Sequence, residues 1–178
     1  MPRDLTEGDR APEFELPEAF GGTVRLEDVL TKGNAVLVFF SGSFGYMCNL
    51  QMKQLTRMYA DFRQAGAELV GLGTNSNFVN SAWKEHLQMP FPILSDFDGE
   101  VSDSYGVLIG REGHYLAGHA RRSVFVVDKR GIIRYAWISY DPSQAQEPDY
   151  DELLEACQNI SSFSGPAPAG RTPETSIP

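Results

Sequence analysis

The stretch "NAVLVFFSGSFGYMCNLQMKQL", residues 34–55, decides the fold. Residues 34–40 are a run of mainly β-branched, aliphatic and aromatic side chains, which is typical of a strand buried on both faces. After a short loop of glycine and serine residues, apolar residues recur at helical spacing from Cys48 until Gly66 supplies a stop. We therefore predict a buried strand at 34–40 and a helix at 48–66 that begins at or beside Cys48.

The rest of the chain extends this unit into a layered fold. "AELVGLG", residues 67–73, predicts a second buried strand, so that strand, helix and strand form a right-handed crossover with parallel strands. The other expected elements are a short edge strand at 23–29, helices at 77–90 and 149–163, a short extended piece at 91–96, one or two helical turns at 99–107 and a hairpin at 123–139. This order predicts an α/β domain at 1–163 with a thioredoxin-like mixed sheet and helices on both faces. The tail at 164–178 has few residues that can join a core, and we expect it to be disordered.

Composition narrows the classes of function. The chain of 178 residues has 24 acidic and 15 basic side chains, a net charge of −9, which argues against binding to nucleic acid or to an anionic membrane. The polar N-terminus does not resemble a secretory signal, and the longest apolar run is far shorter than the roughly 20 residues of a membrane span. We expect a soluble, cytoplasmic protein.

The cysteines and histidines do not form a metal-binding pattern. Cys48 and Cys157 are far apart in the sequence, so the chain has neither a Cys-x-x-Cys redox pair nor zinc-ligand spacing. The histidines at 86, 114 and 119 are scattered. We predict no metal site.

Cys48 is the candidate nucleophile. Only a thiolate attacks, and a free thiol with a pKa near ~8.5 is mostly protonated at neutral pH. The N-terminus of a helix favours negative charge, and Cys48 lies where a strand gives way to a helix. A free cysteine is also often a small buried apolar residue, and the local pattern leaves both interpretations open.

Several longer segments resemble the peroxiredoxins, the alkyl hydroperoxide reductase/thiol-specific antioxidant family. They are "GDRAPEFELPEAFGGTVRLEDV", "AELVGLGTNSNFVNSAWKEH", "FPILSDFDGEVSDSYGV" and "RSVFVVDKRGIIRYAWIS", which follow the family's patterns in the same order. The resemblance runs from about Gly8 to Ile160. It implies a thioredoxin-like fold and an antioxidant thiol peroxidase that needs no metal, flavin or haem.

The peroxidatic motif of that family, Pro-x-x-x-Thr/Ser-x-x-Cys, is degenerate here. Its cysteine falls on Cys48, but Ser41 stands in the place of the proline and Gly45 in the place of the threonine or serine. In the family the proline covers the thiolate, and the hydroxyl residue hydrogen-bonds the sulfur and the peroxide. Phe44 and Gln51 do fit the family pattern.

Three nearby residues are candidates for a substitute hydroxyl. Ser41, Ser43 and Tyr46 all lie within a few residues of Cys48, and a glycine at position 45 gives the loop extra conformational freedom. Nothing in the sequence chooses among them. The interpretation of Ser43 and Tyr46 as ordinary polar loop residues is the simpler one.

The resemblance also assigns an electrostatic partner to Cys48. The family's active-site arginine lies six residues before the Asp of a Phe-Val-hydrophobic-Asp strand, and Arg122 lies six residues before Asp128. By resemblance Arg122 reaches the thiolate, favours its ionised form and orients the peroxide. The alternative is an ordinary arginine at the end of a strand.

The second cysteine bears on how an oxidised Cys48 is reduced back to the thiol. The position five residues after Cys48, where some relatives carry a resolving cysteine, is Lys53, so Cys157 is the remaining internal candidate. Cys157 falls on the apolar stripe of the last predicted helix, which places it in the core. We therefore expect a one-cysteine enzyme that uses thioredoxin, glutaredoxin or a low-molecular-weight thiol as its reductant.

Two other functions stay open because of Ser41 and Gly45. The protein is then either a catalytically weak or inactive relative that senses redox state or binds a partner, or a thiol-disulfide exchange protein. The family also tends to dimerise through loops around the active site, where Phe44 and Tyr46 lie, so the resemblance implies a homodimer.

Overall fold

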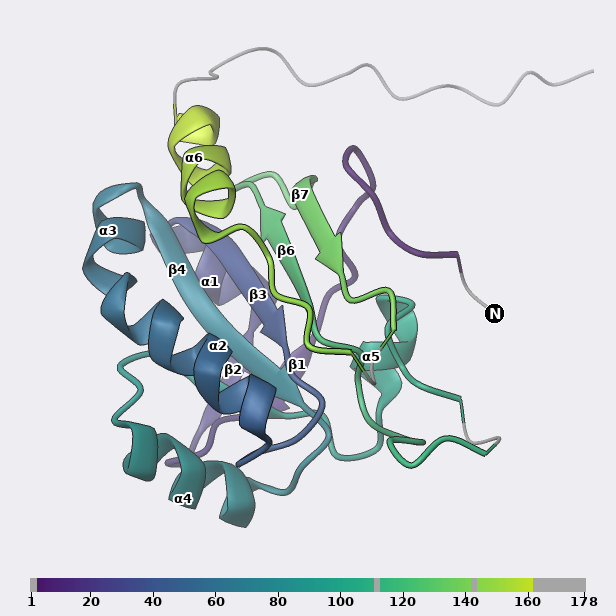
Figure 1. Ribbon diagram of the computed structural model, residues 1–178. Helices are drawn as coiled ribbons and strands as arrows, with labels where there is room; N and C mark the ends of the chain where they lie inside the picture. Colours follow the sequence, from purple (N-terminus) through teal and green to yellow (C-terminus); the bar gives the residue numbers. More distant parts are fainter. Residues whose placement is uncertain (1–2, 111–112, 142–143, 162–178) are drawn as a thin grey trace, which may run out of the picture.

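A five-stranded mixed sheet forms the centre of the molecule. The computed structural model describes residues 3–110, 113–141 and 144–161, so the predicted tail lies outside the described residues. The sheet has the order β5-β4-β3-β6-β7, with β3 (Asn34–Phe39), β4 (Ala67–Gly73), β5 (Ile93–Ser95), β6 (Ser123–Val127) and β7 (Ile133–Ile138). Strands β3, β4 and β5 are parallel, and β6 runs antiparallel to β3 and β7 (Figure 1). The predicted crossover and hairpin are confirmed.

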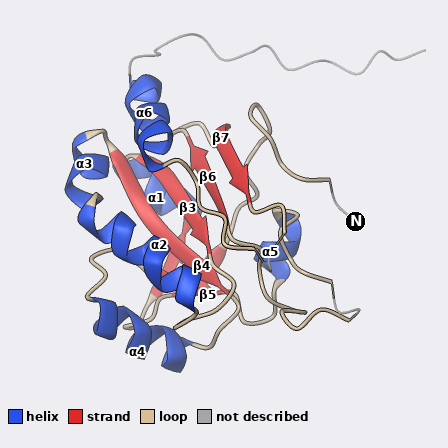
Figure 2. Ribbon diagram, viewed as in Figure 1, coloured by secondary structure: helices blue, strands red, loops and turns tan. Residues whose placement is uncertain are grey.

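Helices cover both faces of this sheet, as predicted. They are α1 (Leu26–Lys32), α2 (Tyr46–Arg57), α3 (Tyr59–Gln64), α4 (Asn77–Leu87), α5 (Glu100–Ser104) and α6 (Tyr150–Ser161). Figure 2 shows α2 and α4 in front of the strands and α1 behind them. None of the helices in the described residues has the length and hydropathy that crossing a membrane requires.

The alternation of side chains along β3 creates two apolar layers. Val36 and Val38 join one buried cluster with residues of α2, α3, α4 and α6, whereas Leu37 and Phe39 join a second cluster with α1. Successive side chains of a strand point to opposite faces, so a strand without polar positions needs cover on both sides. The continuous apolar run at 34–40 therefore dictates a three-layer arrangement.

The predicted edge strand at 23–29 is only partly right. Residues Thr23–Arg25 form β2, which pairs with β1 (Glu15–Pro17) in a separate two-stranded sheet. From Leu26 onward the chain is helical, because Leu26 and Val29 are three residues apart and bury the same side of α1. The β-branched residues at 23–29 obscured this helical spacing.

The structure also changes the bounds of two predicted helices. The helix expected at 48–66 begins at Tyr46 and is interrupted at Met58, whose φ of −90° and ψ of 2° separate α2 from α3. Helix α4 ends at Leu87 rather than at Pro90, because Gln88 adopts a left-handed conformation with φ 53°.

Three segments meet at one edge of the sheet, at the ends of its central strands. The parallel strands β3 and β4 both end there, and the antiparallel β6 begins there. Phe39 pairs with Ser123, so the register places Arg122 opposite Phe40. The loop from Phe40 to Gly45 leaves this edge and leads into α2.

A glycine in β4 makes room for the aromatic residue that precedes this loop. The Phe40 ring lies against Gly73, where an added Cβ atom would overlap it, and its centroid is 4.8 Å from that of Trp83. We expect Gly73→Ala to destabilise the protein by about 1–3 kcal/mol, because Phe40 is fully buried and must move. Urea denaturation measures this change.

Gly42→Ala is the matched control for that measurement. A Cβ atom at Gly42 meets no heavy atom within 4 Å, so the free energy of unfolding should stay within about 0.5 kcal/mol of the unsubstituted protein. Equal stability of the two variants would contradict the close packing of Phe40 on β4.

Candidate active site

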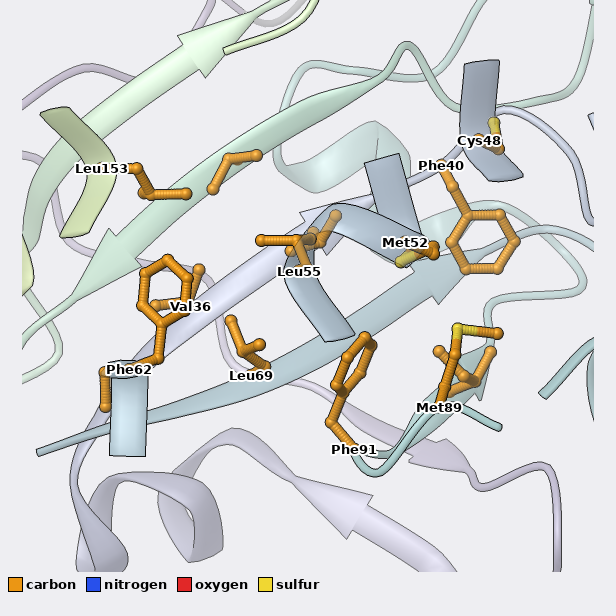
Figure 3. Packing of buried hydrophobic residues seen from close by; sticks show 14 of the residues in the cluster. Val36, Phe40, Cys48, Met52, Leu55, Phe62, Leu69, Met89, Phe91 and Leu153 are labelled. Carbon is orange, nitrogen blue, oxygen red and sulfur yellow. The ribbon is translucent and has the colours of Figure 1, made fainter. Parts of the chain in front are cut away.

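Cys48 lies in the first turn of α2 and is almost completely buried. The residue is 2% exposed, and Gly45, the N-cap of the helix, provides no side-chain cap. Figure 3 shows Cys48 beside Phe40 and Met52 in the buried cluster under α2. Backbone N–H groups in the first turn of a helix have no intrahelical partners and favour a negative charge. The thiol is therefore both part of the core and close to the N–H groups of the first turn of α2.

A serine hydroxyl contacts the sulfur. The Oγ atom of Ser41 lies 3.5 Å from Cys48 Sγ, within hydrogen-bonding distance for sulfur. The other two candidate hydroxyls are directed elsewhere, because Ser43 donates its hydroxyl to Asn80 Oδ1 at 2.8 Å and Tyr46 is 77% exposed. Of the three candidates, the structure brings Ser41 to Cys48.

Gly45 faces the same sulfur atom. An added Cβ atom at this position would lie 3.7 Å from Cys48 Sγ and 3.0 Å from the carbonyl oxygen of Gly42. A side chain at position 45 would therefore point at the thiol. The glycine provides no side chain there.

The loop before α2 is held by residues that the sequence analysis missed. Ser43 donates its backbone N–H to Asn75 Oδ1 at 3.0 Å and its hydroxyl to Asn80. Phe44 has a positive φ of 65°, and its ring centroid lies 5.9 Å from that of His86 on α4. The "TNSN" run directly after β4 was the available signal, since asparagine side chains often fix turns.

Two buried polar side chains keep unpaired atoms. Gln51, one turn after Cys48 on α2, is fully buried, and neither atom of its side-chain amide has a hydrogen-bond partner. Arg122 is 2% exposed; its Nη2 donates to the carbonyl oxygen of Gln144 at 3.2 Å, whereas its Nη1 has no partner. An unpaired buried polar group costs about 1–3 kcal/mol, and in native proteins most such groups are paired. No group in the described part of the chain satisfies these donors and this acceptor.

Cys157 lies on α6, another element of the buried cluster that contains Cys48. It is fully buried on α6, in the core as predicted, and burial raises the pKa of its thiol to about 12. Leu153, one turn earlier on α6, lies at the opposite end of the cluster from Cys48 (Figure 3). Helix α6 packs mainly against α3, β6 and β7. The structure does not bring the two thiols together.

Comparison with known proteins agrees with this arrangement. The model of the AhpC/TSA family matches residues 7–136. The chain is 30% identical over 163 residues to the 2-cysteine peroxiredoxin of Chattonella marina var. antiqua, covering 86% of this chain and 79% of the relative. It is 32% identical over 160 residues to peroxiredoxin 2 of Thermoplasma acidophilum, covering 86% and 75%. The crystal structure of peroxidoxin BcpB from Mycobacterium tuberculosis matches with a TM-score of 0.77 and 25% identity, over 88% of this chain and 98% of that one.

A thioredoxin-like sheet with a cysteine in the first turn of the helix after its central strand defines a class of thiol-dependent redox proteins. Within that class, the chain belongs to the AhpC/TSA family of peroxiredoxins and is a thiol peroxidase. The predicted family and fold are confirmed.

The raised pKa of Cys157 predicts how stability changes at alkaline pH. An unfolded thiol ionises near pH ~8.5, whereas the folded protein keeps the Cys157 proton up to about pH 12. In this window the unfolded chain binds fewer protons than the folded chain, so the free energy of unfolding falls as pH rises, by at most about 1.4 kcal/mol per pH unit. Cys157→Ala has no thiol at this position. Its free energy of unfolding should therefore fall less steeply as pH rises.

Urea denaturation at several pH values between 8 and 10.5 measures the difference between the two proteins. The other groups that titrate there are common to both and cancel in the comparison. If the free energy of unfolding changes with pH equally in the unsubstituted protein and in Cys157→Ala, the raised pKa of the Cys157 thiol is contradicted.

Proposed function

We propose that this peroxiredoxin is a one-cysteine enzyme that reduces hydrogen peroxide or organic hydroperoxides with Cys48 as the nucleophile. The observation that carries the proposal is the placement of Cys48 in the first turn of α2, near an edge of the sheet that also holds a buried arginine with an unpaired Nη1. Buried donors without partners suit a small polar substrate better than a macromolecule.

The reaction transfers one oxygen atom to sulfur. The Cys48 thiolate attacks one peroxide oxygen, the S–O bond forms as the O–O bond breaks, and the other oxygen leaves as hydroxide or alkoxide, which takes up a proton. Sulfur is thereby oxidised by two electrons to a sulfenic acid. Arg122 and the N–H groups of α2 stabilise the negative charge that moves from sulfur to the leaving oxygen.

An external thiol completes the cycle. A thiolate attacks the Cys48 sulfenic acid, releases its oxygen as water and forms a mixed disulfide, and a second thiol then frees Cys48. Thioredoxin, glutaredoxin or a low-molecular-weight thiol supplies these electrons. The 2% exposure of Cys48 favours a small thiol, because a protein reductant requires the first turn of α2 to open.

Two further properties belong to this proposal. We place the enzyme in the cytoplasm, where thiols stay reduced, and both cysteines are free in the structure. We also propose a homodimer that covers the loop beside the site, since Phe44 and Tyr46 are 46% and 77% exposed there.

Rapid mixing with hydrogen peroxide tests the roles of Cys48 and Arg122. We expect the reduced protein to form a sulfenic acid far faster than a free thiol, Cys48→Ser to abolish this reaction, and Arg122→Met to slow it about 10²- to 10³-fold. A sulfenic-acid probe with mass spectrometry measures the product.

Arg121→Met is the matched control, because the neighbouring Arg121 pairs with Asp4 at 2.6 Å. This variant should react at nearly the unsubstituted rate. If the reduced protein reacts no faster than free cysteine, the enzyme mechanism proposed here is wrong and the partner-binding alternative gains support.

The one-cysteine cycle makes a separate prediction. We expect Cys157→Ala to keep its peroxide turnover with a low-molecular-weight thiol to within about twofold, because Cys157 is buried away from Cys48. Mass spectrometry of the peroxide-treated, unreduced protein should show no disulfide between the two cysteines. Such a disulfide, together with lost turnover in Cys157→Ala, would instead establish a two-cysteine cycle.

A further inference from the structure

A buried thiolate at Cys48 needs hydrogen-bond donors. With an exposure of 2%, water cannot solvate the sulfur freely, and a buried charge is costly unless donors compensate for the lost water. Among the hydrogen bonds of the described residues, the side-chain contact that reaches Cys48 Sγ comes from Ser41 Oγ at 3.5 Å.

The direction of this hydrogen bond follows from the charge on sulfur. A thiolate has no proton, so the Ser41 hydroxyl must donate when Cys48 is ionised. Within the described part of the chain, the Ser41 hydroxyl has no second partner, whereas the nearby hydroxyls of Ser43 and Ser95 are bonded to Asn80 and to the carbonyl oxygen of Asn75. The Ser41 proton is available to the sulfur.

The backbone holds Ser41 in place on both sides. The preceding residue, Phe40, donates its N–H to Leu72 at 2.9 Å and is packed between Gly73 and Trp83. The following loop is closed by a hydrogen bond of 3.1 Å from Gly45 N to Gly42 O. A donor fixed before the reaction loses little energy to reorganisation, which is what a catalytic hydrogen bond requires.

The two positions that depart from the peroxiredoxin motif, Ser41 and Gly45, therefore both lie beside the Cys48 sulfur. A proline at position 41 has no hydroxyl, and a hydroxyl residue at position 45 would approach the same sulfur, since its Cβ would lie 3.7 Å away. We propose that Ser41 is a catalytic residue that supplies the hydroxyl missing at Gly45: it donates to the Cys48 thiolate and then to the peroxide oxygen that binds sulfur. This inference rests on the proposed peroxidase function.

The Ser41 hydroxyl has two roles during the attack of the thiolate on the peroxide. Before attack it donates to the thiolate, which the surrounding water cannot reach freely. As the S–O bond forms and the O–O bond breaks, negative charge leaves the sulfur, and rotation about the Cβ–Oγ bond turns the same proton toward oxygen. One serine can serve both stages because Gly45 has no side chain that would compete for the same sulfur.

Ser41→Ala, Ser41→Thr and the double variant Ser41→Ala/Gly45→Ser test this inference. In rapid mixing with hydrogen peroxide at pH 7, Ser41→Ala should form the sulfenic acid about 10- to 100-fold more slowly, the range expected for a hydrogen bond to a charged group. Ser41→Thr keeps the hydroxyl and should stay within a few-fold of the unsubstituted rate. The double variant should regain part of the lost rate.

The pH dependence of alkylation by iodoacetamide separates loss of a donor from distortion of the loop. Loss of the donor makes Ser41→Ala reach half of its maximal alkylation rate at a higher pH. Ser104→Ala, an exposed serine of α5, is the control and should match the unsubstituted protein in both assays.

The outcomes distinguish this inference from the function on which it rests. A fast unsubstituted protein with an equally fast Ser41→Ala overturns the role of Ser41 and leaves the peroxidase intact. A slow Ser41→Ala with an unchanged alkylation profile and no recovery in the double variant also overturns it, because Ser41 would then act only on structure. An unsubstituted protein as slow as free cysteine overturns both proposals.

Discussion

The parallel pairing of β3 with β4 is the constraint on which the rest of the structure depends. Both strands are buried along nearly their whole length, so the pair requires cover on both faces. Parallel strands also force the chain to cross over, and the crossover helix α2 must begin near the edge where β3 ends. Cys48 lies in its first turn for this reason, and the antiparallel β6 brings Arg122 to the same edge. The candidate site is therefore a consequence of how the strands are connected.

The same edge combines apolar packing with polar chemistry. Cys48, Gln51 and Arg122 are each at most 2% exposed, although two of them keep unpaired polar atoms. Such atoms destabilise a fold, and they persist here because two large apolar clusters hold the surrounding elements in place. A surrounding of low polarity also strengthens electrostatic interactions with any charge that forms there. The packing that holds the core together therefore also surrounds the Cys48 sulfur.

The altered peroxidatic motif shows why spacing along the chain differs from position in space. Seen as a linear pattern, Ser41 and Gly45 are two losses, one of a proline and one of a hydroxyl. Seen around the sulfur, Ser41 has an oxygen 3.5 Å away, and Gly45 is a position whose Cβ would lie 3.7 Å away. A loop that turns back on itself brings residues three and seven positions before Cys48 to the same atom. The arrangement of donors around the reacting atom, rather than their order in the chain, decides what the site can do.

Local patterns by themselves predicted most of the architecture. The apolar runs of β3 and β4, the helical spacing after Cys48 and the turn before β7 predicted the layers correctly, because burial imposes periods that are visible in the sequence. The helix at Leu26, the break at Met58 and the end of α4 were misplaced, since these depend on packing against distant elements. Only the tertiary structure decided which hydroxyl contacts Cys48. That contact is set by β-sheet register and loop closure, which neighbouring residues in the sequence do not encode.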